Sequence, residues 1–242
     1  MLSRAFIKNK AVKFQTTELN IIREYCQHLF LSNFYQQKAS DRVLFKGGTA
    51  LRIIYYSPRF SEDLDFTGHK ISIKGIEDLI ANTALKIGEF GILTDIKESK
   101  KTSGGYLGVL GFKLFNFNAE IQIEISLRKI NNIKNQPIVV VNDFIPSYSA
   151  ITLTQENLVT EKINAVLTRS KPRDWYDLYF LLRANLVSAR NKKTLIKLLG
   201  KLRREKINFK SELKNLLPKS HHLVLKNFRG NLEREIKHRA GL

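Results

Sequence analysis

Two glycines and two aspartates stand out among the residues of this chain. Gly47-Gly48-Thr49 follows a short apolar run, and Asp63 and Asp65 flank a single apolar residue. Glycines leave backbone N–H groups open to a phosphate, and the N-terminus of the helix expected directly after them favours an anion. At strand spacing, Asp63 and Asp65 share one face with their Cα atoms about 6.6 Å apart, so they can converge on hard cations. Together the two segments suit phosphoryl transfer, which needs mainly positioning and charge neutralisation.

The same two segments carry a resemblance to a known family. F-K-G-G-T-A-L-R, followed by R-F-S-E-D-L-D-F, resembles the AbiEii/AbiGii-type nucleotidyltransferases. These are toxins of bacterial toxin–antitoxin and abortive-infection systems, related to the MenT toxins, in the DNA polymerase β-like superfamily. The resemblance implies an NTP substrate and Mg²⁺ (or Mn²⁺) held by Asp63 and Asp65. It also implies substrate-binding residues, which are Lys46, Gly47, Gly48, Thr49, Arg59 and Ser61.

A third carboxylate is expected from the resemblance on a strand beside the aspartate pair. Glu120, Gln122 and Glu124 share one face of the run that follows, and isoleucines occupy the other face. Glu124 takes the aligned place as a third metal ligand, although Asp is the expected residue there. Glu120 is the competing choice, and a half-exposed strand with outward polar residues is the simpler alternative.

A second motif lies in the C-terminal half. Glu161-Lys162-Ile163-Asn164-Ala165, with Arg169 and Arg173-Asp174-Trp175-Tyr176-Asp177, resembles the family's E-K-x-x-A…R…R-D-x-Y-D segment. The resemblance implies that Lys162 binds nucleotide phosphates and that Asp174 is a further active-site residue. Asp174 could equally cap a helix that starts at residue 175. We expect Asp177 to pair with Arg173 or Arg169.

The surrounding periodicity predicts an α+β protein of two lobes. Helical spacing covers 16–36, 49–56 and 74–90, and extended runs cover 43–45, 63–66, 92–96, 106–117, 120–127 and 137–141. Pro137 favours an edge position for the last run. Beyond residue 150 every periodic segment is helical, namely 154–168, 174–185, 191–206, 208–216 and 219–238. We therefore expect a catalytic domain over 1–150, with a mixed sheet, and an all-helical bundle over 151–242 that completes the NTP and acceptor cleft.

Charge points to a polyanionic partner. The formal net charge is +19. Residues 151–242 carry 21 Lys and Arg against 8 Asp and Glu, whereas 1–150 carry 20 against 14. Such a field attracts nucleic acid, so we expect an RNA acceptor, and the resemblance makes it the 3′ end of tRNA. Two alternatives are transfer to a small molecule or protein, and non-catalytic binding of NTP or nucleic acid on the same fold.

Other features of the sequence indicate the expected location and partner of the protein. Apolar runs are too short to span a membrane, and residues 1–15 lack a secretory signal. The single cysteine, Cys26, cannot form an internal disulfide, which suits the cytoplasm. The resemblance also implies a cognate antitoxin.

Overall fold

The chain folds into two compact units. The computed structural model describes residues 2–128 and 133–242. One unit comprises Met1–Tyr56 and Phe60–Leu153, and the other comprises Ser57–Arg59 and Thr154–Leu242. The expected division at residue 150 falls three residues before this one, and the short segment 57–59 joins the helical unit. No helix in the described ranges is long and apolar enough to cross a bilayer.

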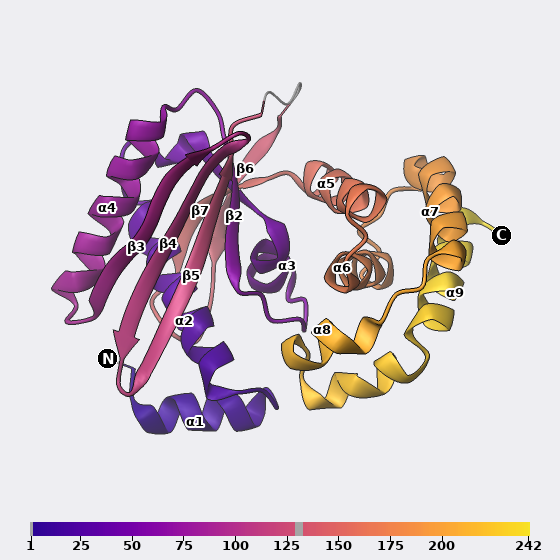
Figure 1. Ribbon diagram of the computed structural model, residues 1–242, viewed down its shortest axis with the longest axis horizontal. Coiled ribbons are helices and arrows are strands. Elements are labelled where there is room, and N and C mark those ends of the chain that lie inside the picture. The colour runs from indigo at the N-terminus through magenta and orange to yellow at the C-terminus, as the bar shows by residue number, and fades with distance from the viewer. Residues whose placement is uncertain (1, 129–132) are drawn as a thin grey trace. The chain divides into compact units, whose positions relative to one another are not determined.

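A mixed sheet forms the centre of the first unit (Figure 1). Its order is β3-β4-β5-β2-β1-β7-β6. The bounds are β1 Val43–Lys46, β2 Asp63–Gly68, β3 Leu93–Thr102, β4 Gly105–Leu114, β5 Phe117–Ser126, β6 Asn135–Val140 and β7 Tyr148–Leu153. The pairs β2–β5 and β1–β7 are parallel, and the remaining pairs are antiparallel. The α+β class is confirmed, and Pro137 lies on the edge strand β6, where a missing N–H is tolerated.

Four helices belong to the same unit: α1 Arg4–Lys13, α2 Glu18–Phe34, α3 Gly47–Tyr55 and α4 Ile73–Glu89. The Thr17 hydroxyl caps α2 by accepting from the Asn20 N–H at 3.2 Å, as a threonine before an apolar helix predicts. Helices α2 and α4 pack on one face of the sheet (Figure 1).

That face is apolar along the two central strands. The ring of Phe66 on β2 lies 5.7 Å from that of Phe34 on α2 and 5.6 Å from that of Phe45 on β1. Because side chains alternate along a strand, Asp65 and Lys46, the neighbours of Phe66 and Phe45, point to the opposite face.

The second unit is helical in its regular elements. They are α5 Gln155–Thr168, α6 Pro172–Arg183, α7 Lys192–Arg204, α8 Phe209–Leu216 and α9 Phe228–Ala240, with 3₁₀ segments at Ala189–Asn191 and Lys219–Asn227. Trp175, Leu202 and Phe228 are buried in its core. The single helix predicted over 219–238 is wrong in its first half. Only Leu225 of the 3₁₀ stretch is buried, so little apolar packing supports a regular α-helix there.

Candidate active site

A tight turn joins β1 to α3 at Gly47. This residue has φ +84°, a left-handed conformation that favours glycine. A Cβ at this position would stand 2.0 Å from Oδ2 of Asp65. The turn therefore needs glycine twice over, for its backbone conformation and for the space that the Asp65 carboxylate fills.

Thr49 connects the same turn to the strand that bears the carboxylates. Its side chain is fully buried, and its hydroxyl donates a hydrogen bond to the backbone carbonyl oxygen of Asp63. The hydroxyl that the sequence suggests for a phosphate is thus used to hold the start of β2 beside the start of α3.

Strand register brings the predicted carboxylates into one row. Asp65 on β2 pairs with Lys46 on β1 and with Glu124 on β5, and Asp63 pairs with Gln122. Paired residues of neighbouring strands share a face, so Lys46, Asp65 and Glu124 follow one another across three strands. Both aspartates are half-buried and Glu124 is exposed, which leaves all three carboxylates within reach of solvent.

The register also separates Glu124 from its competitor. Glu120 precedes Gln122, the first residue of β5 that pairs with β2, and its carboxylate accepts from Lys97 Nζ at 2.5 Å. Glu124 instead accepts from Gln122 Nε2 at 2.5 Å, beside Asp65. The geometry favours Glu124 as the third carboxylate.

The described side chains do not yet form a closed metal cluster. No three His, Cys, Asp or Glu residues of the described ranges are gathered closely enough to hold an ion. The donors themselves are carboxylate oxygens, which Mg²⁺ and Mn²⁺ prefer, and Glu124 can rotate on its exposed strand. The Asp65 carboxylate lies in the space left by the missing side chain of Gly47, and this donor chemistry fits a divalent ion.

Helix α2 holds the segment that leads into β2. Gln27 Nε2 donates to the carbonyl oxygen of Ser61 at 2.9 Å, and Arg23 pairs with Glu62 at 2.8 Å. Arg52 on α3 forms a bidentate pair with Glu24 at 2.8 and 3.2 Å. Ser61, expected as a substrate-binding residue, is thus held through its backbone carbonyl oxygen by α2.

A buried ion triad occupies the helical unit. Arg59 donates from Nε and Nη2 to the Asp177 carboxylate at 2.8 and 3.0 Å, and Lys162 Nζ donates to the same carboxylate at 2.7 Å. Burial would raise the pKa of Asp177, but the charges of Arg59 and Lys162 and their hydrogen bonds lower it to about 2. The expected pairing of Asp177 with Arg173 or Arg169 is wrong, because those arginines pair with Glu212 and Asp174.

Asp174 is fully buried in the first turn of α6. Its carboxylate accepts from Arg169 at 2.8 to 3.1 Å and from the Lys171 N–H at 3.0 Å. The helix begins at Pro172, so Asp174 is the third helical residue and completes a capping box, whereas the sequence suggested a cap before residue 175. This geometry gives Asp174 a clear structural role.

Comparison with known proteins decides the family. The family model described as nucleotidyl transferase AbiEii toxin, type IV toxin–antitoxin system, matches residues 29–240. The chain belongs to the AbiEii family. It is therefore a nucleotidyltransferase, and the family implies an NTP substrate and an antitoxin partner.

Solved structures agree with this fold. The chain resembles the crystal structure of JHP933 from Helicobacter pylori, with a TM-score of 0.63 and 20% identity over 93% of this chain and 94% of that one. A second H. pylori protein, provisionally assigned as a nucleotidyltransferase, matches with a TM-score of 0.65 and 20% identity over 93% and 96% of the two chains. No curated protein matches this AbiEii chain.

Sequence reasoning missed two relationships. One is the role of Asp177 as the common partner of Arg59 and Lys162, since 118 residues separate it from Arg59. The other is the contact between Gly47 and Asp65. The strand alternation and the double glycine signalled the residues, but only the fold shows which of them touch.

Proposed function

We propose that this AbiEii-family enzyme transfers an NMP from an NTP to an RNA acceptor, with Mg²⁺ or Mn²⁺ held by Asp63, Asp65 and Glu124. The observation that carries the proposal is the row of Lys46, Asp65 and Glu124 beside the Gly47 turn. A cation and three carboxylates at the start of a helix suit a metal-bound triphosphate.

The proposed step is a substitution at the α-phosphorus. The oxygen of the acceptor's 3′ hydroxyl forms a bond to that phosphorus, and the bond to the oxygen bridging the β-phosphate breaks, so that pyrophosphate leaves. The hydroxyl proton passes to solvent or to one of the carboxylates. A bound divalent ion supplies charge neutralisation on the phosphate oxygens. The chain's own residues hold the triphosphate and keep the carboxylates in register.

Residues of the helical unit are proposed to assist. Lys162 donates one hydrogen bond to Asp177, and an ammonium has three donors, so Lys162 can also bind a phosphate. Arg59 is proposed to act through the same triad, because its guanidinium is buried against Asp177. Asp174 is proposed as an active-site residue on the family resemblance alone.

Charge supports RNA as the acceptor, and the family resemblance implies the 3′ end of tRNA in particular. The excess of 21 Lys and Arg over 8 Asp and Glu in residues 151–242 would serve no purpose for a small-molecule acceptor. Arg204 and Lys206, both exposed near the end of α7, have no carboxylate partner among the described residues. An RNA acceptor and a lone cysteine both suit the cytoplasm.

The test is a transfer assay with the purified protein. Total tRNA, Mg²⁺ or Mn²⁺ and each α-labelled NTP in turn should give labelled tRNA with at least one nucleotide, and chelation by EDTA should abolish the label. An Asp63→Asn/Asp65→Asn variant serves as the inactive control. Label that appears only on protein, or only on a small molecule from cell extract, would contradict the RNA acceptor.

A further inference from the structure

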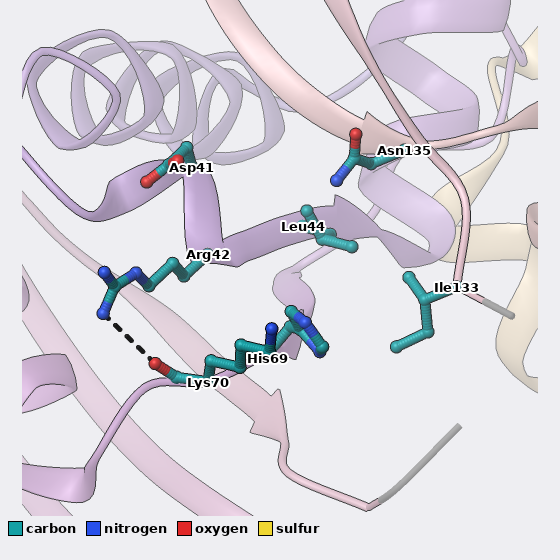
Figure 2. A pocket seen from close by; sticks show the side chains of 7 residues that line it. All are labelled: Asp41, Arg42, Leu44, His69, Lys70, Ile133 and Asn135. Carbon is teal, nitrogen blue, oxygen red and sulfur yellow. Dashed lines mark hydrogen bonds between the residues drawn. The ribbon is translucent and has the colours of Figure 1, made fainter. Parts of the chain in front are cut away.

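A pocket lies at the end of strands β1 and β2 that is farther from the carboxylates. It has a volume of about 660 Å³ and is lined by residues that include Arg42, Leu44, His69 and Lys70 (Figure 2). Arg42 directly precedes β1, and His69 and Lys70 directly follow β2. Since β1 and β2 are antiparallel, these residues lie together at one end of the strand pair, and Lys46 and Asp63 lie at the other end.

The pocket opens on the same face of the sheet as the carboxylate row. Leu44, which lines it, is two residues from Lys46 on β1 and therefore shares its face. The His69 N–H donates to the Arg42 carbonyl oxygen at 2.8 Å, so the β1–β2 ladder continues to the pocket. At about 3.3 Å per residue, His69 lies roughly 13 Å along the strand from Asp65.

The charge at the pocket favours an anion. Neither Arg42 nor Lys70 forms an ion pair with any carboxylate of the described residues, although Asp41 also lines the pocket. Arg42 Nη1 donates to the Lys70 carbonyl oxygen at 3.3 Å, as Figure 2 shows. Lys70 has a left-handed backbone with φ +51°, uncommon for a residue other than glycine. A guanidinium, an ammonium and an imidazole together suit a phosphate.

We propose that this pocket binds a backbone phosphate of the RNA acceptor, upstream of the 3′ end that reacts near Asp65. The inference rests on the proposed RNA acceptor and deepens it, because it gives the polynucleotide a path along β2. A pocket on the carboxylate face, about 13 Å along the strand from Asp65, lies where a polynucleotide that reacts at the carboxylates can place a further backbone phosphate.

The experiment compares two variants that lose the same charges from the same unit. Arg42→Ala/Lys70→Ala removes the pocket's cations, and Arg4→Ala/Lys8→Ala removes one arginine and one lysine from the exposed face of α1. Fluorescence anisotropy with labelled tRNA should show about a tenfold rise in Kd for the pocket variant alone, with the log–log salt slope falling by roughly 0.7 for the one lost phosphate contact. Binding of ATP with Mg²⁺, and transfer to a dinucleotide acceptor, should match wild type.

The outcomes separate the pocket from the reaction. Equal tRNA affinity in the two double variants would overturn the inference. A loss of ATP binding by the pocket variant as large as its loss of tRNA binding would also overturn it, because that result would assign the pocket to free triphosphate. If wild type transfers nothing to RNA but the pocket variant alone loses tRNA binding, the proposed reaction fails and the pocket assignment stands. Lys70→Glu, at an exposed side chain that makes no hydrogen bond of its own with residues 2–128 or 133–242, repeats the test if the double variant does not fold.

Discussion

The carboxylate of Asp65 occupies the space in which a side chain at residue 47 would lie. A Cβ on Gly47 would approach Oδ2 of Asp65 to 2.0 Å, with Cβ and Cγ of Asp65 at 2.5 and 2.6 Å. The glycine that begins α3 and the aspartate in the middle of β2 therefore form one unit of the site. Under the proposed function, in which residue 47 lies at the phosphate and Asp65 holds the metal, this contact would couple the binding of phosphate to the binding of metal.

Gly47→Ala should abolish nucleotide transfer, because the new methyl group displaces Asp65 and strains a left-handed residue. Gly91→Ala is the matched control, since Gly91 also has positive φ, +77°, but an added Cβ would meet nothing within 4 Å. Both variants should lose about 1–2 kcal/mol of stability from backbone strain, and Gly47→Ala should lose more. Urea unfolding and the transfer assay check this; equal activity of the two variants would contradict the coupling.

The strand register predicts different outcomes for the two glutamates of β5. Glu124→Gln should lower transfer about a hundredfold without changing the melting temperature, because Glu124 is the register partner of Asp65 and the proposed third metal ligand. Glu120→Gln should retain near wild-type transfer, since it breaks only a solvent-exposed pair with Lys97, which contributes little to stability. Steady-state transfer rates at saturating Mg²⁺ distinguish the two. A larger loss for Glu120→Gln would reverse the assignment of the third carboxylate.

Asp177→Asn should destabilise the protein by about 3–5 kcal/mol, because it leaves Arg59 and Lys162 buried with their common partner uncharged. The pKa of Asp177 is lowered from 3.8 to about 2, so its contribution is present above pH 4 and is lost as the pH falls toward 2. That contribution amounts to about 2 kcal/mol. Unfolding of wild type and variant at pH 6 and at pH 2.5 should show their difference shrinking at the lower pH.

The control for Asp177→Asn is Asp143→Asn. Its carboxylate pairs with Lys10 but is 65% exposed, so the loss should stay below about 1 kcal/mol. A cost for Asp177→Asn as small as that of Asp143→Asn would show that the triad contributes little to the fold.

Four basic residues near the end of α7 should fall into two pairs with different roles, one that supports the fold and one that binds RNA. Lys201 donates to the Leu167 carbonyl oxygen at 2.8 Å, and Arg203 pairs with Glu233 at 2.5 Å, so both serve the fold. Arg204→Gln/Lys206→Gln should weaken tRNA binding and lower the salt slope by about 0.7 per lost contact, at unchanged stability. Lys201→Gln/Arg203→Gln should lower the melting temperature instead. Unchanged tRNA affinity in the first variant would exclude this end of α7 from the RNA-binding surface.

Much of the first unit could be predicted because its signals are local. The double glycine ends β1, alternation marks β2 and β5, and turn residues separate β3, β4 and β5, so each element follows from a few neighbouring residues. Strand β7 was not predicted. Its residues, Tyr148–Leu153, cross the point at which the helical pattern was expected to begin, and its place is set by β1 and β6, distant in sequence.

The sequence predicts which residues are candidates for the site, but not which of them contact one another. Asp63 and Asp65 follow from spacing and Glu124 from the family resemblance, whereas the pairing of Glu124, and not Glu120, with Asp65 depends on parallel register with β2, which no local pattern encodes. The partners of Lys162 and Asp174 depend on helix packing, so the sequence assigned the arginines of this segment wrongly.

The location of Arg59 limits how this protein could be recombined. The helical unit begins after Leu153, but it also includes Ser57–Arg59, a segment encoded almost a hundred codons earlier. A fragment cut at residue 154 would lose the arginine that holds Asp177 in its bidentate pair. The helices after residue 153 therefore cannot be moved to another protein on their own. A chimaera that joins them to another N-terminal half should fold only if that half supplies an arginine at the position of Arg59, beside Asp177.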